Sequence, residues 1–168
     1  MTDIIYVDKD DNEIGVGPQE IAHANGIIHR VIRIYLFNSR GEVLLQKRAA
    51  HLRTNPGKWN ESVAGHVDVG ETYQEAAVRE MQEELGLSGI ELQEFKKIYL
   101  EENEENKRKR FTALYTGRYD GEVHPNAEEV SIVRWVSPEI IRKEIIENPE
   151  HFSEGSRICL SALLADVA

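Results

Sequence analysis

Short apolar runs alternate with turn-rich polar stretches along the chain, which predicts strands interleaved with a few helices. Residues 29–37, HRVIRIYLF, are β-branched and aromatic and are expected to form a mostly buried strand. Further strands are expected at residues 4–7, 13–16, 42–47, 61–64, 90–101, 110–117 and 130–136. Helices are expected at residues 18–24, 138–146 and 152–165. Ser137 followed by Pro138 favours a capped helix start.

The strongest helix signal lies in residues 72–86. Thr72 and Glu75 have the spacing of a capping box, in which each side chain accepts a hydrogen bond from the other's backbone. An apolar stripe recurs every four residues, at Ala77, Met81 and Leu85. Gly86 follows where a left-handed C-terminal cap fits. Together with the interleaved strands, this helix predicts an α/β fold, a mixed sheet with helices on both faces.

Length and composition fit a single domain spanning residues 1–168. The chain has 168 residues, 40% hydrophobic and 30% charged, which favours a packed core over disorder. It shows no internal repeat, no linker and no apolar run long enough to cross a bilayer. The first residues, MTDIIYVDKDDNEIG, are acidic where a signal peptide would need positive charge. We therefore expect no membrane association.

The charge and cysteine content restrict the partners and the compartment. A net charge of −10 argues against a nucleic-acid surface, which needs a basic face, and much of the excess serves solubility. The single cysteine, Cys159, excludes an internal disulfide and suits a reducing cytosol, so a cytoplasmic location is expected. Its apolar surroundings, ICLSALLA, favour a buried structural thiol. The oligomeric state stays open, and a homodimer remains one of the options.

An acid cluster in residues 65–87, GHVDVGETYQEAAVREMQEELGL, carries the chemical signal. Glu80, Glu83 and Glu84 are three and four positions apart, which places their carboxylates on one helix face. Like charges at this spacing repel, so a hard divalent cation with oxygen ligands is the obvious companion. The preceding loop begins at Gly65, where a glycine permits close approach of the backbone to a ligand.

The spacing resembles the Nudix box without a gap or a substitution. It runs from Gly65 through Glu71 and REMQEE to Gly86 and Leu87. The resemblance implies an α/β/α sandwich that binds Mg²⁺ or Mn²⁺ and hydrolyses a diphosphate linkage. It implies that the three acids, Glu80, Glu83 and Glu84, ligate the metal or its bound water. It also implies that Arg79 pairs with Glu71. A solvated acidic helix face is the alternative, which the complete motif disfavours.

The acid that takes the proton from the attacking water stays open. Glu83 is one candidate, and acids outside the box are others. Those candidates are Glu102, Glu104, Glu128 and Glu129.

A second resemblance covers residues 29–66. IYLFNSRGEVLLQKRA and NPGKWNESVAGHV are similar to the isopentenyl diphosphate isomerase branch of the superfamily. That branch transfers protons through a cysteine at the position of Ala64, and a methyl group cannot do so. It also holds a separate metal with several histidines and two glutamates. His66 matches one ligand, while His23 and His29 lie near the others with the spacing off by a residue.

The two glutamates of that branch should fall near residues 107–109, where this chain has bases. We therefore interpret the chain as an isomerase-like Nudix hydrolase without the isomerase apparatus. Arg48 and Arg53 match positions where the branch holds the diphosphate, with plain surface charge as the alternative. His66 lies inside the box loop and is expected to contact substrate or metal. Trp59 could stack on an organic group, although a packed loop residue is favoured.

The segment EENEENKRKR, residues 101–110, has two interpretations. It is either an exposed hairpin tip or a place where residues 107–110 meet substrate phosphates.

Three function classes follow for the whole chain. The leading one is a metal-dependent hydrolase acting on a small organic or nucleoside diphosphate. The second is an isomerase of a prenyl diphosphate, which Ala64 disfavours. The third is a non-catalytic metabolite sensor, which the intact acid set disfavours.

Overall fold

The computed structural model describes residues 3–102 and 108–167. Glu104 and Lys107, both named above as candidates, lie outside the described residues. The strands are β1 (Asp3–Val7), β2 (Glu13–Pro18), β3 (His29–Phe37), β4 (Val43–Arg48), β5 (Trp59–Asn60), β6 (Val63–His66), β7 (Gln93–Glu101), β8 (Lys109–Arg118) and β9 (Val130–Val136). The helices are α1 (Gln19–Asn25), α2 (Tyr73–Leu85), α3 (Pro138–Glu147) and α4 (Glu154–Asp166), with a 3₁₀ turn η1 (Pro149–His151).

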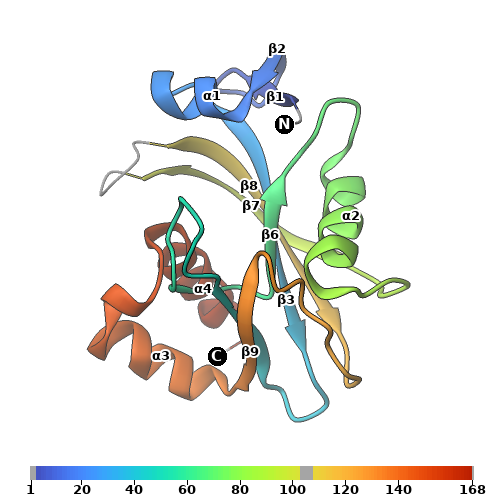
Figure 1. Ribbon diagram of the computed structural model, residues 1–168, viewed down its shortest axis with the longest axis vertical. Coiled ribbons are helices and arrows are strands. Elements are labelled where there is room, and N and C mark those ends of the chain that lie inside the picture. The colour runs from blue at the N-terminus through green and yellow to red at the C-terminus, as the bar shows by residue number, and fades with distance from the viewer. Residues whose placement is uncertain (1–2, 103–107, 168) are drawn as a thin grey trace.

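Strand β3 lies at the centre of a mixed sheet (Figure 1). On one side it pairs in parallel with β8 over nine residues, from His29 opposite Arg110 to Phe37 opposite Arg118. On the other side it pairs antiparallel with β6, where Val31 faces His66. β7 pairs antiparallel with the other edge of β8, and β4 pairs antiparallel with both β5 and β9. The hairpin of β1 and β2 joins at the start of β3.

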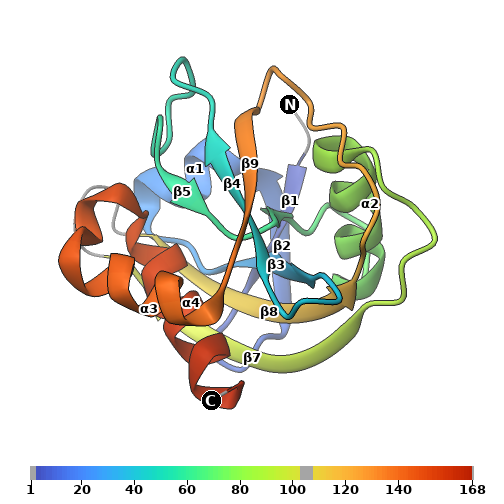
Figure 2. The same cartoon turned by 90° about the horizontal axis from the view of Figure 1, so that it is seen from below.

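The helices form a layer on each face of the sheet, with α2 on one face and α3 and α4 on the other (Figure 2). Strand alternation divides the side chains of β3 between two cores, because successive residues point to opposite faces. Ile32 and Ile34 are in the core under α2, whereas Tyr35 is in the core with α3 and α4. The α/β/α sandwich with a mixed sheet is therefore confirmed.

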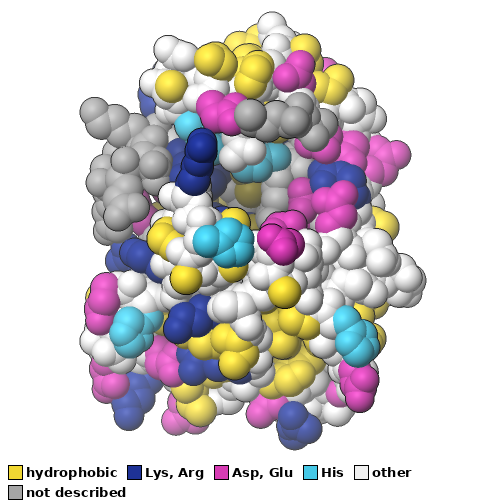
Figure 3. Space-filling model, in the orientation of Figure 1, with side chains coloured by type: hydrophobic (Ala, Val, Ile, Leu, Met, Phe, Trp, Pro, Cys, Tyr) yellow, Lys and Arg dark blue, Asp and Glu magenta, His cyan; other side chains and the backbone are white. Residues whose placement is uncertain are grey.

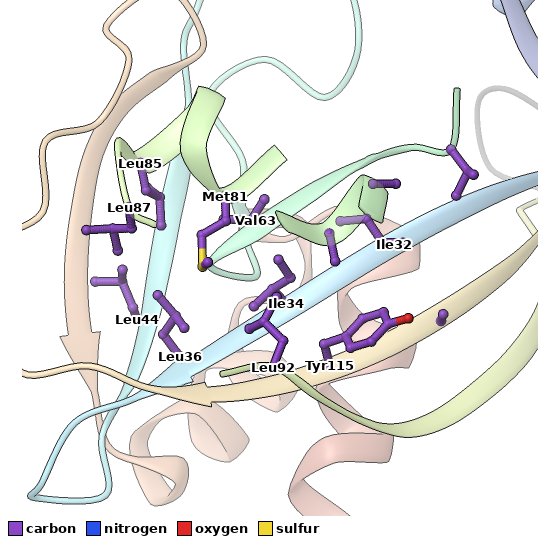
Figure 4. Close-up of a cluster of buried hydrophobic side chains, with 14 of the residues drawn as sticks. Ile32, Ile34, Leu36, Leu44, Val63, Met81, Leu85, Leu87, Leu92 and Tyr115 are labelled. Atoms are coloured by element: carbon purple, nitrogen blue, oxygen red, sulfur yellow. The ribbon is translucent and has the colours of Figure 1, made fainter. Parts of the chain in front are cut away.

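The core under α2 is built from the predicted apolar stripe of that helix. Met81 and Leu85 reach down from α2 onto β3 and its neighbours (Figure 4). Both side chains are fully buried, and Ile32 and Ile34 beneath them are equally inaccessible. Their burial fixes the rotation of α2, because only one face of a helix can meet the sheet. The acidic face of α2 is thereby turned to one side of this core.

Most element predictions are confirmed, with shifts at the ends. Ser137 accepts the backbone hydrogen bond of Ile140 and caps α3 as expected. The expected helix from residue 152 begins later, because the side chain of Ser153 accepts the first free backbone N–H and serves as its cap. Cys159 is fully buried in α4, as predicted. Within the described residues, no helix is long and apolar enough to cross a membrane.

Candidate functional site

Helix α2 is capped at both ends by residues of the motif, Thr72 at its start and Gly86 at its end. Thr72 accepts a hydrogen bond from the backbone of Glu75, and Glu75 accepts one from the backbone of Thr72, which completes the predicted capping box. At the other end Gly86 takes the left-handed conformation, φ 67°, and its backbone N–H donates to Gln82. These caps hold the helix register, and the register sets which side chains reach the site.

Arg79 lies among the acids of the box. Its Nε and Nη2 donate to the two carboxylate oxygens of Glu71, at 2.6 and 2.9 Å. Nη2 also donates to the His66 carbonyl at 3.0 Å, which fastens the loop to the helix. Nη1 donates to Glu80 at 2.8 Å and to Glu83 at 3.2 Å. One guanidinium thus donates hydrogen bonds to three carboxylates and also lies 3.5 Å from Asp68, and its planar fork suits this arrangement.

Glu80 reaches the site by passing across the backbone of Gly65. A Cβ at position 65 would come closer than 3.0 Å to the Cγ, Cδ and Oε1 atoms of Glu80. The absence of a side chain at Gly65 is therefore what leaves room for this carboxylate. Burial is the main cause that raises the pKa of Glu80 to about 7.

The three helix acids differ in their surroundings. Glu84 is buried, and Gln46 Nε2 donates to its Oε2 at 2.5 Å. Burial, and then the charge of Glu80, hold the pKa of Glu84 well above its ordinary value. The Glu83 side chain is 54% exposed, so it faces solvent beside the other two. Hard oxygen donors that repel one another fit a hard divalent cation, and these residues could hold one.

Glu129 joins this acid cluster from outside the box. It shares a hollow with Glu80 and Glu83, and it also lines the pocket that contains Glu84. The Asn126 backbone donates to the Glu84 carbonyl at 2.8 Å, and its side chain donates to Glu129 at 3.3 Å, which ties the loop before β9 to α2. Of the other candidate acids, Glu128 is exposed and Glu102 is buried against Arg110.

The acid cluster opens into a polar pocket of about 230 Å³ on the face of the sheet that carries α4. Histidine, acidic and basic side chains gather around this hollow below the N-terminal elements (Figure 3). Arg48 and His66 both line the pocket, and Arg48 donates to the Thr54 carbonyl at 2.8 Å. Arg53 is exposed on the loop and is not among the lining residues.

The structure brings three histidines together, although their sequence spacing did not match the isomerase branch. His23 at the end of α1, His29 on β3 and His66 on β6 each place a ligand nitrogen within 4.8 Å of the others. Their Nε2 atoms are buried and have no hydrogen-bond partner among the described residues. His29 Nδ1 lies 3.1 Å from the Ile27 carbonyl, so Nδ1 carries the proton and Nε2 the lone pair.

Burial is the main cause that lowers the pKa of His23 to about 3 and that of His29 to about 4. Burial also lowers the pKa of His66 well below its ordinary value. Neutral imidazoles with free lone pairs are the form that ligates transition metals, so the residues present fit such an ion. The resemblance to the isomerase branch had pointed to these three histidines, and the approach of β3 to β6 and α1 brings them together despite the mismatched spacing.

The remaining isomerase-like positions carry different groups. Ala64 lies on β6 opposite Arg33 and presents a methyl group to the pocket. Arg108 and Arg110 enter the pocket near the place where the isomerase branch has its two acids. Trp59 packs under the guanidinium of Arg134, whose Cζ lies 4.1 Å from the ring centroid, so its ring is already covered on that side.

Comparison with known proteins places these features in a family. A model of the NUDIX domain matches residues 27–154. Isopentenyl-diphosphate Delta-isomerase 1 of Aromatoleum aromaticum is 33% identical over 169 residues, covering 96% of this chain and 92% of the relative. An uncharacterized Nudix hydrolase of Pseudomonas aeruginosa is 33% identical and covers 84% of this chain and 82% of its own. A crystal structure from Deinococcus radiodurans has a similar fold, with TM-score 0.72, 24% identity and coverage of 87% and 90%.

Proposed function

The chain belongs to the NUDIX domain family, and we propose that it is a metal-dependent hydrolase of a small organic or nucleoside diphosphate. The observation that carries this proposal is the acid cluster at the mouth of the polar pocket. The carboxylates of Glu80 and Glu84 are buried near each other, and Glu129 lies close to both. Burying like charges costs free energy unless a cation joins them, and Mg²⁺ or Mn²⁺ meets that need.

The residues around the cluster have separate tasks in this reaction. Bound Mg²⁺ or Mn²⁺ offsets the charge of a diphosphate and lowers the pKa of a bound water. Glu80 and Glu84 would hold the metal from the buried side. Glu83 is solvent-accessible in the same hollow, which suits it to accept the proton of the attacking water. Arg79 fixes the loop through Glu71 and keeps the acids in place.

Arg48 and His66 line the pocket beyond the acids and are assigned to the substrate. Arg48 is anchored to the Thr54 carbonyl through Nε, which leaves the rest of its guanidinium for a phosphate. Arg53 lies farther out on the same loop and could reach only a group that extends from the pocket.

An isomerase of a prenyl diphosphate is the second candidate. The cluster of His23, His29 and His66 favours it, as do relatives that bear the isomerase name. Ala64 argues against it, because the proton transfer of that branch needs a thiol there. The pocket is also polar, and a prenyl chain would displace water from charged groups without apolar contacts in return.

A hydrolysis panel tests the two candidates. The protein is incubated with Mg²⁺ or Mn²⁺ and nucleotide, sugar and prenyl diphosphates, and phosphate or monophosphate release is measured. We expect turnover that falls at least about 100-fold in Glu84→Gln and is retained in Glu139→Gln, an exposed acid on α3. Absence of hydrolysis across the panel refutes the hydrolase. Conversion of isopentenyl to dimethylallyl diphosphate would instead support the isomerase.

A further inference from the structure

A glutamine occupies a core position of β4. Successive side chains of a strand point to opposite faces, so Gln46 faces α2 together with Leu44, which packs in the core under that helix. Gln46 is only 3% exposed, and its backbone is paired on both sides, with Asn60 of β5 and Val133 of β9 (Figure 2). A buried amide costs free energy unless it is hydrogen-bonded, so the partners of Gln46 indicate its role.

Both amide protons of Gln46 have an acceptor. Its Nε2 donates to the carbonyl of Ser62 at 3.1 Å and to Oε2 of Glu84 at 2.5 Å. A backbone carbonyl can only accept, so the amide nitrogen of Gln46, and not its oxygen, must face Ser62. The same nitrogen lies against Glu84, so the hydrogen bond runs from the amide to the carboxylate.

Ser62 holds this amide in a fixed place. Its Oγ accepts from the Leu36 backbone at 2.9 Å and donates to the Leu44 carbonyl at 2.6 Å, so Ser62 is fastened to both β3 and β4. Ser62 is fully buried, and water does not compete for these bonds. The donor that points at the helix acid is therefore anchored in the sheet.

Glu84 is held at its backbone and at one carboxylate oxygen. The Asn126 backbone donates to the Glu84 carbonyl at 2.8 Å, and Gln46 occupies Oε2. Within the described residues Oε1 accepts no hydrogen bond, although Glu84 is only 4% exposed and lines the polar pocket. Oε1 is therefore the oxygen left for a cation.

The partner of Glu84 is neutral, in contrast to the partner of the other two helix acids. Arg79 donates to both Glu80 and Glu83, and its guanidinium offsets part of their charge. An amide orients a carboxylate without adding a charge of its own. A cation beside Glu84 would therefore meet an undiminished carboxylate whose direction Gln46 sets.

A single free oxygen suits some cations better than others. Ca²⁺ takes about six to eight oxygen ligands and often both oxygens of one carboxylate, whereas Mg²⁺ requires a compact octahedral arrangement. To ligate with both oxygens, Glu84 would have to withdraw Oε2 from Gln46, which leaves a buried amide proton without an acceptor. The hydrogen bond thus penalises a cation that needs both oxygens and spares one that needs a single oxygen.

We propose that Gln46 is a positioning residue that restricts Glu84 to one ligating oxygen and thereby selects Mg²⁺ or Mn²⁺ over Ca²⁺. This inference rests on the divalent cation of the proposed function and adds the selectivity of its site. Gln46 acts through Glu84 and is not itself assigned to the metal or the substrate.

The experiment measures cation selectivity without substrate. Binding of Mn²⁺ to the metal-free protein is followed by the loss of the free Mn²⁺ signal in electron paramagnetic resonance. Mg²⁺ and Ca²⁺ are then titrated in as competitors, and the ratio of their displacement constants gives the selectivity. The wild type is compared with Gln46→Met, whose side chain is similar in length and has no N–H donor. Gln93→Met, at an exposed glutamine on β7, is the matched control.

Folding of each variant is checked by thermal melts, because the Ser62 carbonyl also loses its donor in Gln46→Met. If that variant does not fold, Gln46→Asn replaces it, since its amide is one methylene shorter and cannot reach both acceptors. The wild-type selectivity is measured in either case and needs no variant.

We expect Mg²⁺ to displace Mn²⁺ from the wild type at least as effectively as Ca²⁺ does. In Gln46→Met the ratio should shift toward Ca²⁺ by about tenfold, because no buried amide is left unpaired when Glu84 uses both oxygens. Gln93→Met should keep the wild-type ratio. A merely structural role of Gln46 would weaken all three cations alike. An unchanged ratio in a folded variant, or a wild type that binds Ca²⁺ about tenfold more tightly than Mg²⁺, overturns the inference.

Failure of the proposed hydrolysis has a separate signature. A wild type that shows the expected selectivity but hydrolyses no diphosphate refutes the proposed function and leaves the inference standing. A wild type that hydrolyses diphosphates but binds no Mn²⁺ without substrate overturns the inference and leaves the proposed function standing.

Discussion

Replacing Gly65 by alanine tests how the site is assembled. The new Cβ would lie closer than 3.0 Å to three atoms of the Glu80 side chain, so Glu80 must move. Position 65 has no positive φ, so the substitution adds crowding and no backbone strain. Moving Glu80 breaks its 2.8 Å hydrogen bond to Arg79 and displaces a buried carboxylate of the acid cluster.

Overpacking of this kind costs about 1–3 kcal/mol. For a chain of this length each kcal/mol lowers Tm by about 2–4 °C, so we expect a decrease of about 2–12 °C. A displaced metal ligand should also reduce Mg²⁺-dependent hydrolysis by about 100-fold. Thermal unfolding and initial rates measure the two effects. Gly15→Ala, on an exposed strand with an ordinary 4.0 Å contact, is the control.

A double-mutant cycle with Glu80→Ala separates crowding from other causes. With the Glu80 side chain shortened, the Cβ at position 65 no longer meets it, so Gly65→Ala should cost little in that background. The coupling free energy between the two substitutions should therefore be nearly as large as the loss of stability in Gly65→Ala alone. A Gly65→Ala protein that is as stable and active as the wild type would refute the steric argument. So would an equal loss of stability in the Glu80→Ala background.

Two further predictions concern the loop and the buried thiol. Glu71→Gln should lower stability by about 1 kcal/mol, since its ion pair with Arg79 is partly exposed. The hydrogen bond from Arg79 lowers the pKa of Glu71 below its ordinary value. The difference in stability between Glu71→Gln and the wild type should therefore disappear as the pH falls through that lowered pKa. Cys159 should react with a thiol reagent at pH 8 only after unfolding, because burial raises its pKa to about 11. Rapid labelling of folded protein would contradict this.

Local sequence signals predicted the elements that depend on nearby residues. The capping box of Thr72 and Glu75 and the cap at Gly86 are present as expected, since both are set by contacts within a few positions. The spacing of the box also predicted that its acids lie near one another. It did not predict that Glu84 would be buried while Glu83 faces solvent, because burial depends on how α2 packs on the sheet.

Features that need distant segments were only partly predicted: the family resemblance named the three histidines, but not that they meet. His23, His29 and His66 come from a helix and two strands, and their spacing along the chain says nothing of their distance in space. Glu129 was one candidate among several, and only the loop before β9 brings it to α2. The segment of residues 101–110 was expected to be an exposed tip or a phosphate contact. At its described end Arg108 and Arg110 are buried and line a pocket, so this end is not an exposed tip, and the contact with substrate phosphates stays a prediction.

The parallel pairing of β3 with β8 has a consequence for how the chain folds. The two strands lie roughly 80 positions apart, and such long-range pairing is slow because loop closure precedes the stabilising contacts. Until β8 has been synthesised, the central strand has an unpaired apolar edge that can pair with other chains. Cotranslational folding should therefore finish late, and slow codons or truncation before β8 should favour aggregation.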